Sequence, residues 1–307
     1  MRIVFMGTPE FAVPSLEILV EANYEVVGVV TAPDKPSGRG LQLTPSAVKK
    51  CAVRFGIPVL QPEKLKSTEF LEALKQLEAD LFVVVAFRML PEAVWNMPPK
   101  GTFNLHASLL PNYRGAAPLN WAIINGEKET GLTTFFLQHE IDTGDMILQE
   151  KEGISEEDTI GTLYERMKKK GAGLVLKTVQ TIQKGNVETH PQVWTEKIQP
   201  APKIFKEDCQ IQWDQTAQSV HNLVRGLSPY PAAYCLLNGK ICKIFTTKLT
   251  NEQTNNVETN NFLTDNKSFL KVSCSDYYLH IVALQLEGKK KMGIEEFLRG
   301  TKVETIA

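Results

Sequence analysis

Residues 81–87 have the sequence Leu-Phe-Val-Val-Val-Ala-Phe, the longest strongly apolar stretch in the chain. Its length suits a buried strand and falls far short of the roughly 20 residues that a membrane-spanning helix needs. Because a strand that is apolar at successive positions must be covered on both faces, such a run is typical of a parallel sheet between layers of helices. The stretch therefore predicts an α/β fold and indicates no membrane role.

The residues before this stretch repeat the same alternation of short apolar runs and amphipathic segments. We predict strands at Ile3–Met6 and Val26–Val30, and helices at Phe11–Ala22, Pro45–Phe55 and Thr68–Leu77. This rhythm favours a Rossmann-like, mostly parallel sheet.

The turn Gly7-Thr-Pro-Glu10 is predicted to lead from the first strand into a helix, with Thr8 as the N-cap and Pro9 as the first helical residue. It holds one glycine where a dinucleotide fingerprint needs three, so we discount a nicotinamide or flavin enzyme.

The composition and the periodicity of the sequence change in the second half. A basic helix is expected to follow Asp158 and to run toward Gln183, and a stretch rich in proline with weak periodicity comes next. Such a stretch suits a linker between independently packed units. We therefore expect an N-terminal domain at 1–189, a linker at 190–205 and a smaller C-terminal domain at 206–307.

The C-terminal domain is predicted to begin with a helix and to continue as a small OB-like β-barrel. The helix is expected at Gln215–Gly226, and strands at Ala233–Leu237, Ile241–Thr247, Phe269–Ser273 and Tyr278–Leu284. The polar tract Thr250–Asn261 has almost nothing to bury, so we expect an exposed hairpin loop there. The dense basic run Lys289-Lys-Lys291 fits an RNA contact and a protected sheet edge equally well.

The composition excludes several classes of protein. Lys and Arg total 34 against 35 Asp and Glu in 307 residues, so no overall field favours nucleic acid. Five scattered cysteines without a Cys-x-x-Cys pair argue against a disulfide framework or a structural zinc. We expect a cytoplasmic protein with reduced thiols and no metal, and a monomer, because no unexplained apolar surface helix stands out.

Candidate catalytic residues lie in Gly101-Thr-Phe-Asn-Leu-His-Ala-Ser-Leu-Leu-Pro111. In an extended strand Asn104, His106 and Ser108 would share one face, because side chains alternate between faces. A side-chain amide can donate to an oxyanion, an imidazole can move a proton, and a nearby carboxylate such as Asp142 can orient that imidazole. Asn104 or His106 alone has an ordinary structural explanation, but the set favours acyl transfer.

Four motifs in order resemble the folate-dependent formyltransferases. They are Phe5-Met-Gly-Thr-Pro-Glu-Phe-Ala12, Thr31-Ala-Pro-Asp-Lys-Pro-Ser-Gly-Arg-Gly40, the block from Asn104 to Pro118, and Ile141-Asp-Thr-Gly-Asp145. The resemblance covers nearly the whole chain. It implies that 10-formyltetrahydrofolate donates a formyl group to the α-amino group of methionine esterified to initiator tRNA.

The resemblance also implies roles for individual residues. Asn104, helped by His106, would stabilise the oxyanion, His106 would shuttle a proton, and Asp142 would orient His106. The tetrahydrofolate pocket would be lined by Ser108, Leu109, Leu110 and Pro111 and bordered by Met89 and Leu90. Asp145 is expected to hold the Asp142 loop and Thr143-Gly144 to allow its tight path, while Arg114 and Gly115 would shape the pocket entrance.

The acceptor is implied by two further regions. Lys35 and Arg39 lie in a loop rich in proline and glycine and would contact tRNA, although Leu41-Gln42 stand where the family usually has lysines. The C-terminal domain, which contains Ile211-Gln-Trp213 and Arg225-Gly-Leu-Ser-Pro-Tyr-Pro231, would be the tRNA-binding domain, and 1–189 would be the catalytic domain.

Three alternative functions stay open. The same catalytic set could formylate a small amine such as a nucleotide-linked sugar, or it could release formate from the folate with water as acceptor. The third alternative is a non-catalytic RNA-binding module in which the strand holding Asn104 and His106 is only structural. That alternative predicts that His106→Ala leaves function intact.

Overall fold

The computed structural model describes residues 1–37, 42–185, 187–196, 198–255 and 257–307. Contacts divide the chain into two compact units. The first consists of Met1–Gly115, Thr130–Glu152 and Tyr164–Pro200, and the second of Ala116–Glu129, Gly153–Leu163 and Ala201–Ala307. The expected division at 190–205 into a catalytic domain, a linker and a tRNA-binding domain stays a prediction.

The elements up to the Asn104 strand are β1 (Arg2–Gly7), η1 (Glu10–Ala12), α1 (Val13–Glu21), β2 (Glu25–Val30), β3 (Lys35–Ser37), β4 (Gln42–Thr44), α2 (Ala47–Arg54), β5 (Val59–Leu60), α3 (Thr68–Gln76), β6 (Leu81–Val85), α4 (Glu92–Trp95) and β7 (Thr102–His106). The chain continues through β8 (Arg114–Gly115), α5 (Pro118–Ile124), β9 (Glu129–Phe136), β10 (Met146–Gly153), α6 (Ile160–Lys184), β11 (Pro200–Ala201) and η2 (Glu207–Cys209). It ends with α7 (Ala217–Leu227), β12 (Ala233–Leu237), β13 (Lys240–Gln253), β14 (Phe262–Thr264), β15 (Leu270–Ser273), β16 (Tyr277–Leu286), β17 (Met292–Gly293) and α8 (Ile294–Gly300).

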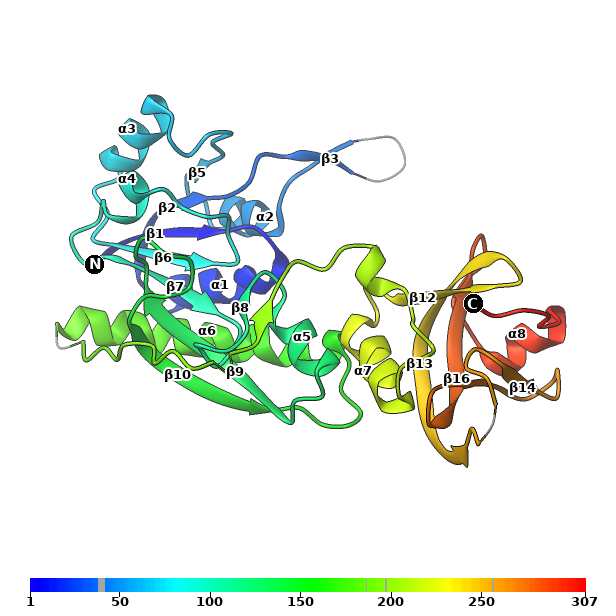
Figure 1. The fold of residues 1–307 in the computed structure, drawn as a ribbon. Helices are drawn as coiled ribbons and strands as arrows, with labels where there is room; N and C mark the ends of the chain where they lie inside the picture. The colour runs from blue at the N-terminus through cyan, green and yellow to red at the C-terminus, as the bar shows by residue number, and fades with distance from the viewer. Residues whose placement is uncertain (38–41, 186, 197, 256) are drawn as a thin grey trace. The chain divides into compact units, whose positions relative to one another are not determined.

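The predicted apolar runs form the centre of the first unit's sheet (Figure 1). In the described part of the chain this sheet has seven strands in the order β10-β9-β7-β6-β1-β2-β5. The pairs β1/β2, β1/β6, β2/β5 and β6/β7 are parallel, and β7/β9 is antiparallel. Five strands, β5-β2-β1-β6-β7, follow the Rossmann order 3-2-1-4-5, so the prediction of a Rossmann-like, mostly parallel sheet is confirmed.

Helices bury both faces of this sheet. On one face Val4 of β1 and Val84 of β6 share an apolar cluster with Phe70 and Leu74 of α3 and Val94 of α4. On the other face α6 approaches β7 closely, since a Cβ on Gly171 would lie 2.8 Å from Leu105 Cδ2. Helix α6 thus packs against β7, the strand that carries Asn104 and His106.

The predicted start of the first helix is wrong in one detail. A 3₁₀ turn, η1, precedes α1, its N-cap position is Pro9, and no side chain caps it. Thr8 therefore does not act as the N-cap. Helix α1 begins only at Val13, with Pro14 in its first turn, where proline lacks only an N–H that would have no partner anyway.

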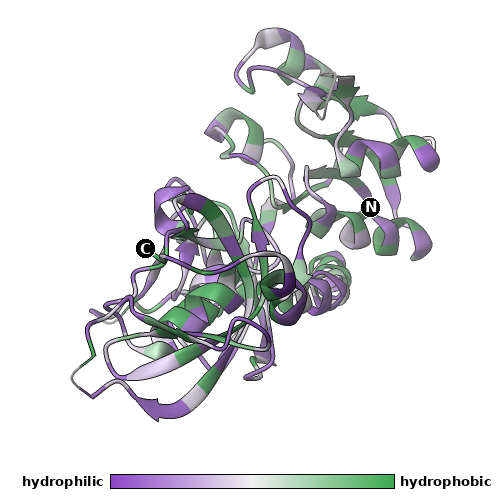
Figure 2. Cartoon of the chain, turned by 90° about the vertical axis from the view of Figure 1, so that its right-hand side faces the viewer, coloured by the Kyte–Doolittle hydropathy of each residue, from purple (hydrophilic) through white to green (hydrophobic). Residues whose placement is uncertain are grey.

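The second unit is built on an antiparallel sheet. Its strands run in the order β12-β13-β16-β15-β14, with β17 also paired to β16, as far as the described residues show. Figure 2 shows hydrophobic and hydrophilic stretches alternating along these strands, as expected when one face is buried. Strands β12 and β13 are joined by Asn238 and Gly239, both at positive φ (51° and 72°), the conformation of a tight type I′ hairpin.

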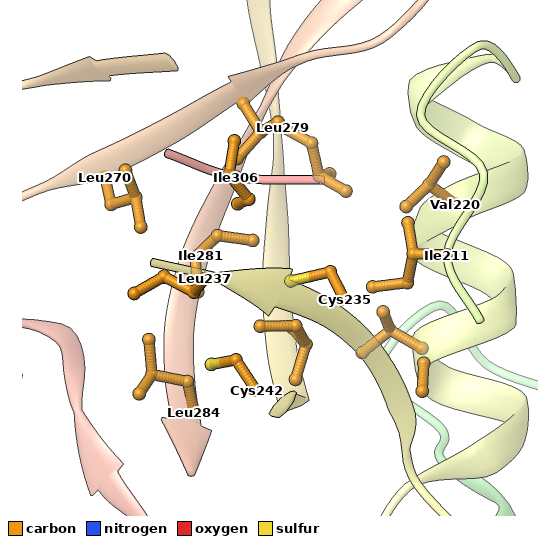
Figure 3. Packing of buried hydrophobic residues seen from close by; sticks show 14 of the residues in the cluster. Ile211, Val220, Cys235, Leu237, Cys242, Leu270, Leu279, Ile281, Leu284 and Ile306 are labelled. Carbon is orange, nitrogen blue, oxygen red and sulfur yellow. The ribbon is translucent and has the colours of Figure 1, made fainter. Parts of the chain in front are cut away.

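The core of the second unit lies between this sheet and α7. Figure 3 shows side chains from strands β12, β13, β15 and β16 converging with Ile211 and with Val220 of α7. The antiparallel order of this sheet fits the predicted barrel-like fold. The cluster contains Cys209, Cys235, Cys242 and Cys274, and all five cysteines, each a described residue, are buried and free.

The predicted loop Thr250–Asn261 is partly wrong. Strand β13 continues to Gln253, which pairs with Tyr277 of β16. The sequence from Thr250 onward is polar because this end of the strand is exposed, yet its backbone is still paired to β16.

No helix among the described residues is long and apolar enough to cross a membrane.

We predict that His221 makes the second unit sensitive to acid. Burial first, and Arg225 second, lower the pKa of His221 to about 4, while Glu156 acts in the opposite direction. In the unfolded chain His221 binds a proton near pH 6.5, whereas in the folded unit it stays neutral down to about pH 4. The free energy of unfolding is therefore highest above pH 6.5 and decreases as the pH falls toward 4. The shift corresponds to about 3 kcal/mol at most.

The measurement is the denaturant midpoint of the second unit between pH 4.5 and 7.5. His221→Asn should flatten its pH dependence over this window, at the cost of the 2.7 Å contact between His221 Nδ1 and Thr247 Oγ1. An equally steep decline in the variant would contradict the assignment.

Candidate active site

The candidate site is at the carboxyl end of β7, the edge where open α/β sheets bind ligands. Asn104 pairs with Val84 on β6 and with Phe135 on β9, and His106 pairs with Thr133 on β9. Alternation along the strand places Asn104 and His106 on one face. The strand ends at His106, so the expectation that Ser108 continues this strand face is wrong.

His106 is held by the backbone that follows its own strand. Its side chain is nearly buried, and Nε2 lies 2.8 Å from the carbonyl oxygen of Tyr113. Since a carbonyl only accepts hydrogen bonds, Nε2 must carry the proton, which we assign from this contact. Nδ1 is therefore the nitrogen that can gain and lose a proton.

Asp142 faces that nitrogen. Its Oδ2 atom lies 3.8 Å from His106 Nδ1, beyond hydrogen-bond length but close enough for electrostatic attraction. The same oxygen accepts a hydrogen bond of 3.3 Å from the backbone N–H of Gly115. The structure thus brings His106 and Asp142 together, as predicted from the sequence, and adds Tyr113 and Gly115 as their holders.

The side-chain amide of Asn104 is the third group of the candidate site. Its side chain is partly exposed, and no hydrogen bond from it to another described residue is recorded. Nor is a contact with His106 or Asp142 recorded among those residues. Asn104 is related to His106 by the shared face of β7, and Asp142 joins them from its loop through His106. An amide without an internal partner on a reactive face can donate to a ligand oxygen.

The turn after the strand is held together internally. Ser108 Oγ donates to the carbonyl oxygen of Asn112 at 2.6 Å, and its side chain is fully buried. Thr133 Oγ1 donates to the Ser108 carbonyl and accepts from the Leu110 N–H. Leu110 is buried, whereas Leu109 and Pro111 are partly exposed, so a ligand would meet Leu109, Pro111 and backbone atoms before the Ser108 hydroxyl.

The other predicted folate contacts differ in exposure. Met89 has 69% of its surface exposed, whereas Leu90 is 7% exposed and belongs to the apolar cluster under α3 and α4. Only Met89 is therefore available to a ligand in this arrangement.

One of the two predicted tRNA residues, Lys35, begins β3 of the β3–β4 pair. Lys35 is exposed and pairs with Thr44, and Arg39 lies outside the described residues. The stem of the hairpin is fixed, because Asp34 forms an ion pair of 2.6 Å with Lys49 and accepts from Gln61 at 2.8 Å. No contact of Lys35 with the catalytic set is recorded among the described residues.

Several residues of the site were not predicted from the sequence. Thr133 and Gln149 hold the Leu110 backbone, since Gln149 Nε2 donates to the Leu110 carbonyl at 3.1 Å and to Thr133 Oγ1 at 3.0 Å. Tyr113 contributes through its carbonyl, which any residue carries. Among the described residues no group of three or more His, Cys, Asp and Glu side chains is placed to hold a metal ion.

Gly144 is required by a close backbone approach. A Cβ at this position would lie 1.7 Å from the Phe136 carbonyl oxygen, a contact that no side-chain movement can relieve. We therefore expect Gly144→Ala to displace the Asp142 loop and to lower activity by about 100-fold, the scale of a misplaced catalytic group. Gly153→Ala is the control because, its chain neighbours aside, no atom of the described residues lies within 4 Å of its added Cβ. Steady-state turnover of both variants is the measurement, and equal rates would contradict the expectation.

The chain is similar to known proteins over nearly its whole length. Residues 1–179 match the family described as Formyl transferase, and residues 203–302 match the Formyl transferase C-terminal domain. The chain is 53% identical to methionyl-tRNA formyltransferase of Parabacteroides distasonis, over 98% of this chain and 96% of that protein. It is 48% identical to the protein of the same name from Flavobacterium johnsoniae, with 98% and 96% covered.

A solved structure shares the fold at lower identity. It is an N-formyltransferase from Helicobacter canadensis in complex with folinic acid and dTDP-3-aminofucose, with a TM-score of 0.69 and 23% identity. The match covers 94% of this chain and 99% of that one.

Proposed function

The chain belongs to the formyl transferase family, and on this premise we propose that it formylates initiator methionyl-tRNA. The formyl group comes from 10-formyltetrahydrofolate, and the product is N-formylmethionyl-tRNA for translation initiation. Identity at about half of all positions with proteins named methionyl-tRNA formyltransferase, over nearly the full length of both chains, supports this acceptor. The observation that carries the chemistry is His106, held by the Tyr113 carbonyl and facing Asp142 on the Asn104 face of β7.

The reaction sets two problems for the enzyme. A free α-amino group titrates at about 7.7–8.0, so a useful neutral fraction attacks the formyl carbon without activation. The carbonyl oxygen then gains negative charge, and the folate nitrogen must collect a proton as its bond to the formyl carbon breaks. Charge stabilisation and proton movement are therefore the enzyme's tasks.

Asn104 and His106 divide these tasks. The Asn104 amide donates to the developing oxyanion, as side-chain amides do in other acyl-transfer sites. His106 Nδ1 accepts the proton that the attacking amine loses and returns it to the departing nitrogen. Asp142 attracts the protonated imidazole that exists between these two transfers.

The folate donor is a substrate that the strand-end turn is suited to hold. Leu109, Pro111 and Met89 offer apolar surface, and a flat heterocycle is commonly bound between apolar side chains and a few backbone groups. In this proposal the folate meets these three side chains, and they are supported by the buried residues Ser108, Leu110 and Leu90.

The acceptor contacts are assigned to two regions. Lys35 and Arg39 contact tRNA phosphates. Residues 206–307 form an OB-like tRNA-binding domain, and residues 1–189 form the catalytic domain. The protein acts as a cytoplasmic monomer and uses no metal.

The hairpin assignment predicts a change in salt dependence. Because each lost phosphate contact removes about one unit of the logarithmic salt slope, Lys35→Ala combined with Arg39→Ala should raise the KM for tRNA and flatten its dependence on salt. The charge-matched control is Lys66→Ala combined with Lys75→Ala. Both lysines are exposed; Lys66 lies just before α3 and Lys75 lies in it. KM for tRNA is measured from 50 to 200 mM salt, and an unchanged slope would remove the hairpin from the RNA interface.

The function is tested by comparing acceptors. Purified protein and 10-formyltetrahydrofolate are incubated with methionyl-tRNA, with a nucleotide-linked amino sugar, or with neither, and products are identified by mass. We expect formylmethionine after ester hydrolysis in the first reaction only. Formylation of the sugar instead would establish the small-amine alternative, and formate release without acceptor would establish the hydrolase.

A further inference from the structure

One side chain outside the predicted set reaches the Asp142 loop from residues 190–200. Gln192 Nε2 donates to the carbonyl oxygens of Asp142 and Gly144, both at 2.9 Å. Its Oε1 accepts from Arg114 Nε at 3.2 Å and from a terminal guanidinium nitrogen at 2.6 Å. Both N–H donors and the acceptor of the amide are therefore used, and the contacts fix which way the amide points.

Arg114 is itself held in place. Its guanidinium carbon lies 4.7 Å from the centroid of the Trp194 ring, two residues beyond Gln192. Burial lowers the pKa of Arg114, and the Asp142 and Glu140 carboxylates oppose that shift. An arginine stays charged throughout, so Oε1 of Gln192 always meets a cationic donor.

These contacts act on a loop that needs restraint. Asp142 has a φ of 54°, a left-handed conformation that is uncommon for residues other than glycine and persists where the surroundings impose it. Gly115, the neighbour of Arg114, donates to the Asp142 carboxylate, and Gln192 holds the Asp142 carbonyl. Residue 190 pairs with the exit of the loop, because His190 and Met146 exchange two backbone hydrogen bonds of 2.8 and 2.9 Å.

We infer that Gln192 is a positioning residue that fixes the Asp142 carboxylate against His106, and that Arg114, stacked on Trp194, orients Gln192. This inference deepens the proposed function and rests on it for its kinetic test. Gln192 and Trp194, which follow α6 in the chain, thus help to hold the Asp142 loop in position. Loss of these contacts changes the geometry of proton transfer and leaves the surfaces that bind folate and tRNA in place.

The test uses the full-length protein and two substitutions of the same residue. Gln192→Glu has the same shape and keeps the acceptor for Arg114 but loses both donors, and Gln192→Ala loses all three contacts. Each should lower kcat by about 10- to 100-fold with nearly unchanged KM for methionyl-tRNA and for the folate donor. Gln76→Ala, at an exposed position in α3, is the control and should be like the wild type.

A double-mutant cycle tests the role of Arg114. Because Arg114 acts through Gln192, Arg114→Ala should lower kcat alone but add little to Gln192→Ala. Hydrogen–deuterium exchange of residues 138–146 gives a readout that needs no catalysis, and exchange there should rise in both Gln192 variants while β1 stays protected.

The outcomes separate this inference from the proposed function. Wild-type kcat and unchanged loop exchange in Gln192→Glu would overturn the inference, and so would a raised KM with kcat intact. A wild-type protein that forms no formylmethionine would overturn the proposed function, and loop exchange alone would then decide whether Gln192 braces Asp142.

Discussion

His106→Ala is expected to lower kcat by about 10²–10⁴, the range that general acid–base groups contribute. His106 Nε2 lies 2.8 Å from the Tyr113 carbonyl oxygen, and His106 Nδ1 lies 3.8 Å from Asp142 Oδ2. Removal of His106 leaves no group in that position to carry the proton from amine to folate nitrogen. Steady-state kinetics with methionyl-tRNA as acceptor measures the effect.

His139→Ala is the matched control for this substitution. The His139 side chain is 75% exposed and has no part in the proposed chemistry, so its loss should leave kcat unchanged. Normal turnover in His106→Ala, with the thermal midpoint confirming that both variants fold, would instead favour a purely structural strand.

Asn104→Ala is expected to lower kcat by about 10²–10³, the cost of removing one oxyanion donor. Stability should change little, because no internal hydrogen bond of the Asn104 side chain is recorded among the described residues. The combination of a stable fold and a slow reaction would indicate a donor reserved for the transition state.

Asn104→Asp sharpens this second prediction. The variant keeps the size of the side chain but presents a negatively charged acceptor where the donor was. It should therefore be at least as slow as Asn104→Ala. A rate near that of the wild type in Asn104→Asp would show that the side chain fills space and does not donate.

The central strands were predictable because they carry their own signal. The run at 81–87 and the run at 26–30 are apolar at successive positions, and this pattern alone indicates strands buried on both faces. Burial of β6 at every position agrees with that expectation. The paired spacing of Asn104 and His106 was equally visible, because alternation within a strand is a local property.

Features that depend on distant partners were not predictable. Strand β13 continues through polar residues to Gln253 because Tyr277 pairs with it, and no local pattern marks that pairing. Tyr113 holds His106 through a backbone carbonyl, which has no residue signature. Gln192 stands in a proline-rich stretch that resembles an ordinary linker, and its role follows only from the carbonyls it meets.

The most direct measurement is single-turnover formyl transfer with enzyme in excess over methionyl-tRNA, because it isolates the chemical step from product release. We predict one exponential phase of formylmethionine formation in the wild-type protein. Asn104→Ala combined with His106→Ala should be about as slow as the slower single variant, since groups that act as a unit lose their contributions together. A double variant that transfers the formyl group at the wild-type rate would contradict the assignment of the chemistry to the end of β7.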